Sequence, residues 1–176
     1  MSYQVWRKML QREYTWLQQH YPLSIPVKPL LVLPSDSWIF TSSDSLPRAE
    51  GEVLEMMDGG YMIGISIPDT PSWDEQQLQW AKMYNIPSQH LYAFILYHEY
   101  AHLVEMNEVY FLHGEVRMRE MIDAHGALVA WLRSQENSWS REEVGMWYRL
   151  LPMEEYADRF AIRVYNMRKH LLKGET

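Results

Sequence analysis

The residues with the clearest chemical meaning are two histidines and a glutamate in the segment His98-Glu99-Tyr100-Ala101-His102. They form the pattern H-E-x-x-H. On a helix, two histidines four residues apart lie on one face, so both imidazoles can reach the same ion. Glu99 directly follows the first histidine, where its carboxylate can reach a water molecule at an open coordination position without binding the ion itself. Hydrolysis catalysed by a zinc ion needs this set of groups: neutral nitrogen ligands, an activated water and a carboxylate that accepts a proton.

The surrounding sequence predicts that this pattern lies on a helix. The segment Asn85-Ile86-Pro87-Ser88 predicts the end of one helix and the start of the next, with Ser88 as the expected N-cap. No glycine or proline occurs from Gln89 to Met106, and one face repeats at steps of three and four residues: Leu91, Phe94, Ile95, His98 and His102. A core helix with hydrogen-bonded histidines is the alternative. Two histidines and an acid on one buried face favour an ion.

A catalytic zinc site needs a third protein ligand. One extended pattern places a glycine and a third histidine after the second histidine, but Glu105 and Glu108 stand at those positions and exclude it. The other common solution takes a glutamate from a later helix. Glu154 and Asp158 lie four residues apart, so we expect Glu154 to bind the ion and Asp158 to accept a hydrogen bond from a ligand histidine. Glu155 points about 100° away on a helix, so only one of the two glutamates should bind.

The two motifs together resemble the gluzincin class of zinc metallopeptidases. They are most similar to the small cytoplasmic ImmA/IrrE-like proteins and the minimal gluzincins, through His98-Glu99-x-x-His102 and Glu154-x-x-Ala157-Asp158-x-Phe160-Ala161. The resemblance, which covers only these two stretches, implies Zn²⁺ held by His98, His102 and Glu154, with Glu99 as the general base. It also implies an α+β fold, a mainly helical zincin-like domain with a small antiparallel sheet, an active-site helix and a downstream glutamate helix.

The remaining elements can be placed from periodicity and punctuation. Helices are predicted at 3–21, 72–84, 109–133, 140–151 and 153–172. Capping boxes at 72–75 and 140–143 begin the second and fourth of these helices, and Pro152 precedes the last. Gly114 and Gly126 are weak points in the helix at 109–133. Strands are predicted at 30–33, 38–41, 53–57 and 61–67, the last two joined as a hairpin by Asp58-Gly59-Gly60. Gly64 indicates a close approach or a bulge. Residues 109–150 are predicted to be an inserted helical segment.

Bulk composition limits the class of protein. With 176 residues, 47% of them hydrophobic, a single domain over 1–176 is expected. The net charge of −7, without a long basic run, argues against nucleic acid as the partner. The absence of cysteine excludes a disulfide framework and a cysteine-bound zinc. No apolar run approaches the roughly 18 residues of a membrane span, so a cytoplasmic protein is expected.

The predicted function is zinc-dependent hydrolysis of peptide bonds by a metalloendopeptidase. We expect a peptide or protein substrate to lie as an extended strand along residues 61–67. The alternative is a zinc-binding regulatory or interaction module of the same fold, with lost or latent peptidase activity. A di-iron site would need a second E-x-x-H, which the chain lacks.

The sequence leaves open which residue polarises the substrate carbonyl. The candidates come from the inserted segment and the glutamate helix: His113, His125, Tyr148 and Tyr156. Surface or packing roles are the alternative for each. The remaining ionisable residues near these motifs are expected to be solvated: His20, His90 and His170 near helix ends, and Glu105, Glu108 and Glu115 on an exposed face.

Overall fold

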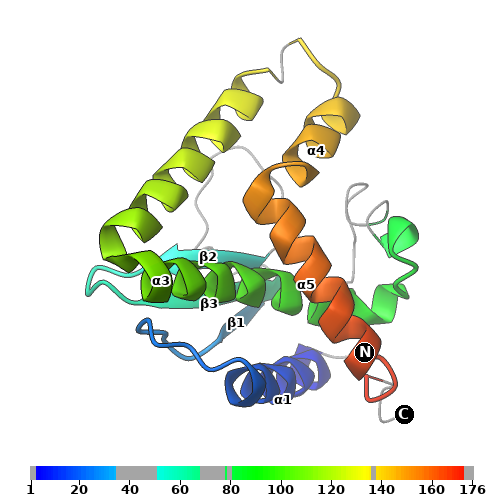
Figure 1. Cartoon of the computed structure of the whole chain (residues 1–176). Helices are drawn as coiled ribbons and strands as arrows, with labels where there is room; N and C mark the ends of the chain where they lie inside the picture. The colour runs from blue at the N-terminus through cyan, green and yellow to red at the C-terminus, as the bar shows by residue number, and fades with distance from the viewer. Residues whose placement is uncertain (1–2, 35–50, 68–77, 79–80, 136–137, 173–176) are drawn as a thin grey trace.

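The fold is mainly helical with one small sheet, as predicted. The computed structural model describes residues 3–34, 51–67, 78, 81–135 and 138–172. The first half of α3 (Leu91–Ser134) packs against the sheet, with α1 (Tyr3–His20) below it and α5 (Pro152–Arg168) crossing it (Figure 1). The second half of α3 leaves the body of the molecule and leads to α4 (Arg141–Arg149).

The sheet has the strand order β1-β3-β2, formed by β1 (Leu31–Pro34), β2 (Gly51–Glu55) and β3 (Tyr61–Ile67). The pair β2–β3 is antiparallel, and Gly59 in its turn has φ 80°, as the predicted hairpin requires. The pair β1–β3 is parallel, so the sheet is mixed rather than antiparallel throughout. Gly64 lies in regular register with both neighbours and forms no bulge.

The strand β3, where the substrate is expected to lie, occupies the centre of the sheet. Ile63, Ile65 and Ile67 on one face and Gly64 and Ser66 on the other are buried, which is typical of a strand covered on both faces. β1 pairs with residues 64–67 on one edge and β2 pairs with residues 61–65 on the other, so β3 is the central strand. Within the described part of the chain, the outer edge of β2 pairs with no strand. The predicted strand at 38–41 and the capping box at 72–75 lie outside the described residues.

The helices follow the predicted pattern with three differences. The predicted helices 89–106 and 109–133 form one helix, α3, which is interrupted where Gly114 adopts φ 82° and ψ 176°. Ser88 does not cap α3; it opens the 3₁₀ turn η1 (Ser88–His90), and neither that turn nor α3 has a side-chain cap. The Ser140–Glu143 capping box is present at α4. Pro152 opens α5, which ends at Arg168 rather than at residue 172.

A buried carboxylate ties three helices together. Glu13 of α1 is fully buried and accepts hydrogen bonds from the Tyr97 hydroxyl of α3 at 2.7 Å and from the Arg168 guanidinium of α5 at 2.8 and 2.9 Å. Burial alone would raise the pKa of Glu13, but the bonds to Arg168 and Tyr97 outweigh it and lower that pKa. Glu13 is therefore an ionised anchor between the first and last helices.

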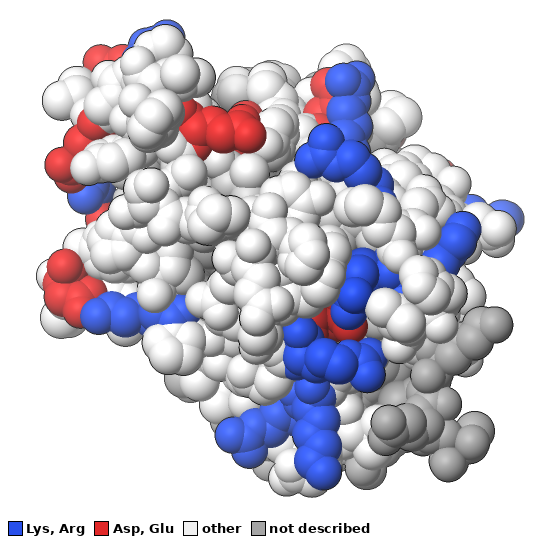
Figure 2. All heavy atoms as spheres, turned by 60° about the horizontal axis from the view of Figure 1, so that its bottom comes forward, with Lys and Arg blue, Asp and Glu red and all other residues white. Residues whose placement is uncertain are grey.

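Charge is unevenly spread over the surface. Figure 2 brings forward the underside of the view in Figure 1 and shows Lys and Arg side chains gathered there, although the net charge is −7. Exposed basic residues on α1 include Arg7, Lys8 and Arg12. Among the described helices, none combines the length and apolar character that crossing a membrane requires.

Candidate metal centre

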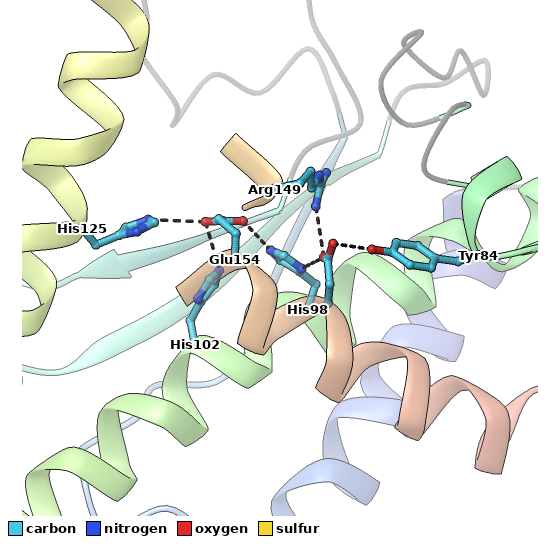
Figure 3. Close-up of polar contacts among 7 residues, drawn as sticks. Tyr84, His98, His102, His125, Arg149 and Glu154 are labelled. Carbon is cyan, nitrogen blue, oxygen red and sulfur yellow. Dashed lines mark hydrogen bonds and ion pairs between the residues drawn. The ribbon is translucent and has the colours of Figure 1, made fainter. Parts of the chain in front are cut away.

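Three buried side chains converge where α3 meets the start of α5. His98, His102 and Glu154 are 5%, 8% and 1% exposed, and one donor atom from each lies within 4.8 Å of the other two. Glu154 Oε2 is 3.1 Å from His98 Nε2, and Glu154 Oε1 is 3.7 Å from His102 Nε2. A tetrahedral ion with bonds of about 2.0–2.1 Å separates its ligands by about 3.3 Å. The group could therefore hold a metal ion (Figure 3).

Local sequence explains this convergence. His98 and His102 are one helical turn apart on the buried face of α3. Pro152 starts α5, so Glu154 falls in its first turn. Ala157 and Ala161 are fully buried, and their small side chains allow close packing between helices. The Glu154 carboxylate therefore lies next to the imidazoles of His98 and His102.

Asp158 lies beside the group, where its spacing from Glu154 predicted it. Its Oδ1 is 2.9 Å from His98 Nδ1, which leaves His98 Nε2 facing Glu154. The Tyr84 hydroxyl donates to Asp158 Oδ2 at 2.8 Å, and Arg149 Nη1 donates to Oδ1 at 3.1 Å. Sequence reasoning missed Tyr84 and Arg149, because each comes from another element and neither has a motif. The three contacts hold Asp158 in the orientation that fixes the His98 ring.

The electrostatics of the three donors depend on one another. Burial alone would raise the pKa of Glu154, but hydrogen bonding to His125 and His98 and the charge of His98 lower it. Burial lowers the pKa of His98, but its hydrogen bonds to Asp158 and Glu154 outweigh burial and raise that pKa to about 9. Burial and the charge of His98 lower the pKa of His102 to about 3. The three groups therefore titrate together, and His98 is the more basic of the two histidines.

Glu99 lies against the start of β2. A Cβ atom at Gly51 would stand 2.7 Å from Glu99 Cγ and 2.5 Å from Ile95 Cγ2, so only glycine allows β2 to approach this closely. Glu99 is half-buried, and burial raises its pKa to about 7 although the charge of His98 opposes the rise. A carboxyl with such a pKa can accept and return a proton near neutral pH. Sequence reasoning missed Gly51; its position at the end of a polar loop gave no signal.

The structure separates the four candidates for polarising a carbonyl. His125 Nε2 is 3.4 Å from Glu154 Oε1. The Tyr148 hydroxyl lies beside Glu154, and burial together with that negative charge raises the pKa of Tyr148. Tyr156 instead bonds Glu108, and His113 is exposed in the wall of a cavity of about 430 Å³. Only His125 and Tyr148 adjoin the metal group.

Two residues expected to be solvated are not. His90 is 6% exposed, because the turn at Ser88–His90 directs its ring inward, where Nδ1 lies 3.0 Å from the Tyr165 hydroxyl. Glu105 is half-buried, and burial with the charge of Glu108 raises its pKa to about 7. The other four are exposed as predicted: His20, His170, Glu108 and Glu115.

No protein-family model, curated protein or solved structure matches the chain. The resemblance to gluzincins therefore rests on the motif residues alone. The geometry supports a possible metal site formed by His98, His102 and Glu154.

Proposed function

We propose that this protein is a zinc-dependent peptidase of gluzincin type. In it, His98, His102 and Glu154 hold Zn²⁺ and Glu99 is the general base. The observation that carries this proposal is the convergence of three buried donors from two helices, with a half-buried carboxylate on the residue after the first histidine. Asp158, at 2.9 Å from the far nitrogen of His98, adds the outer hydrogen bond that ligand histidines in metal sites usually make.

The donor set favours a transition-metal ion such as zinc over Mg²⁺ and Ca²⁺. Two imidazoles and one carboxylate are poor ligands for Mg²⁺ and Ca²⁺, which prefer oxygen alone. The chain has no cysteine that could select a softer ion. Two histidines and a glutamate are a recurrent ligand set of catalytic zinc, with a fourth position open to water or substrate.

The proposed reaction divides the work between the metal and the chain. Bound zinc would supply a water of lowered pKa and polarise the substrate carbonyl. Glu99 takes a proton from the attacking water and delivers it to the leaving amine, and its pKa of about 7 suits both transfers. Tyr148, whose hydroxyl lies beside Glu154, is the residue that we assign to donate a hydrogen bond to the carbonyl oxygen.

We assign the substrate to the outer edge of β2 rather than to β3. An extended peptide could add there as a further strand through main-chain hydrogen bonds. The contact of Gly51 with Glu99 supports this position, because it brings the start of β2 next to the proposed base.

Metal analysis of the purified protein, followed by Glu99→Gln, tests the proposal. One zinc per chain is expected in the wild type and in the variant, because Glu99 is not a ligand. Cleavage of a panel of unstructured proteins should fall roughly 10²–10⁴-fold in the variant, since a carboxamide cannot accept the proton. Glu108→Gln, an exposed position on the same helix, is the matched control and should keep wild-type activity.

Two results would change the conclusion. Cleavage at the wild-type rate by Glu99→Gln, with contaminating proteases excluded, would refute the mechanism. Zinc-loaded wild type that cuts no member of the panel would favour the regulatory or interaction module instead.

A further inference from the structure

The inserted segment places a third histidine at the metal group. His125 lies on α3 beyond the interruption at Gly114, and its side chain is 20% exposed. A straight helix would carry residue 125 about 16 Å past residue 114, away from the sheet and from α5. The positive φ at Gly114 instead redirects the helix, and the imidazole of His125 points at Glu154 (Figure 3).

The two oxygens of Glu154 have different neighbours. Oε2 is 3.1 Å from His98 Nε2, whereas Oε1 is 3.4 Å from His125 Nε2 and 3.7 Å from His102 Nε2. Figure 3 shows that His98 and His125 approach the carboxylate from opposite sides. Among the described residues, the close group of possible ligand atoms includes His98, His102 and Glu154 but not His125. The geometry thus places His125 beside a ligand carboxylate rather than among the ligands.

We propose that His125 is a positioning residue, which donates a hydrogen bond from Nε2 to Oε1 of Glu154 and so leaves Oε2 to bind the ion. This inference rests on the proposed metal site. A monodentate carboxylate ligand has one oxygen to spare, and a donor on that oxygen fixes the orientation of the other. His125 would thereby fix the orientation of Glu154 by a hydrogen bond, as Asp158 fixes the orientation of His98. It would also make metal binding depend on the segment after Gly114.

The first arm of the test measures metal affinity. Zinc and cobalt affinities are determined by competition with a chelator for the wild type, His125→Ala and His125→Gln. The control is His113→Ala, an exposed histidine of the same helix that lines the same cavity as His125. We expect His125→Ala to bind both metals about 10–100-fold more weakly and His113→Ala to bind them normally. His125→Gln should recover most of the loss, because its amide can still donate.

The visible spectrum of bound Co²⁺ separates positioning from ligation. If His125 only positions Glu154, cobalt keeps the same number of nitrogen ligands in His125→Ala. Loss of a nitrogen ligand from the spectrum, without recovery in His125→Gln, would make His125 a ligand and overturn the proposal. Equal metal affinity in His125→Ala and His113→Ala would overturn it as well.

A second arm needs no metal. Urea unfolding of the metal-free wild type, His125→Ala, Glu154→Gln and the double variant forms a mutant cycle. A non-additive shift of the unfolding midpoints is expected if His125 holds Glu154, and additivity would refute that contact. If the wild type bound neither zinc nor cobalt, the proposed function would fail, and this cycle alone would decide whether His125 holds Glu154.

Discussion

Replacing Glu154 with glutamine tests the assignment of the third ligand. Glu154 is 1% exposed and faces both histidines, whereas the adjacent Glu155 is exposed and pairs with Arg159 on the surface of α5. Glu155→Gln makes the same chemical change one residue away and is therefore the matched control. Metal binding should respond to the first substitution and ignore the second.

The size of the effect follows from the number of ligands. Structural zinc sites with four protein ligands bind with roughly 10–16 kcal/mol at pH 7, or roughly 2.5–4 kcal/mol per ligand. Three possible protein ligands form this group. Loss of the only anionic one should cost about 2.5–4 kcal/mol, which at 1.4 kcal/mol per decade is roughly 10²–10³-fold in the dissociation constant.

Competition with a zinc-binding dye measures this loss, and unfolding of each metal-free variant shows whether the protein is still folded. Folded Glu154→Gln with an affinity within about threefold of the wild type would refute Glu154 as a ligand. A loss confined to Glu155→Gln would move the ligand by one residue.

Three further predictions concern protons and packing. The pKa of metal-free His98 is raised to about 9, so below that pH a metal ion must displace a proton from His98 in order to bind. The metal affinity should therefore fall about tenfold per pH unit from pH 8 to pH 6. Binding that does not depend on pH would contradict a protonated His98. Glu13→Gln leaves Arg168 without its carboxylate and should lower the free energy of unfolding by roughly 3–5 kcal/mol at pH 7. Because the pKa of Glu13 is lower in the folded state, the loss of stability is fully present above the unfolded-state pKa near 4.5 and disappears as the pH falls through the folded-state pKa. Urea titrations that gave the same loss of stability at pH 7 and at acid pH would contradict this reasoning. Gly51→Ala places a Cβ atom 2.7 Å from Glu99 Cγ, so it should lower the free energy of unfolding by about 1–3 kcal/mol. Cleavage should fall while the metal content stays normal. An unchanged melting temperature would show that β2 can move aside.

The elements and the ligand group were predictable because they depend on local spacing. His98 and His102 share a helical face through their four-residue separation, and the same separation placed Asp158 one turn after Glu154. The predicted hairpin and the capping box at Ser140 were confirmed because turn and cap chemistry is fixed within a few residues.

What the sequence could not supply depends on contacts between distant segments. The place of β1 in the sheet follows from tertiary packing, and it makes β3 central. Tyr84 reaches Asp158 across 74 positions, and nothing near Tyr84 in the sequence marks it. Gly114 was recognised as a weak point, but periodicity could not predict that the turn there would direct His125 onto Glu154.

The link between Glu13 and Arg168 has a consequence for synthesis of the chain. Its two residues are 155 positions apart, and Arg12 also donates to the carbonyl of Leu171. At about 5–20 residues per second, a ribosome needs roughly 8 to 30 s to add the second partner after the first. During this time Glu13 keeps its neighbour Arg12 but lacks Arg168, and the apolar face of α1 is only partly covered. The nascent chain should therefore be most prone to capture by chaperones before its last helix emerges, and a ribosome-bound chain stalled ahead of Arg168 should be cut readily by added protease.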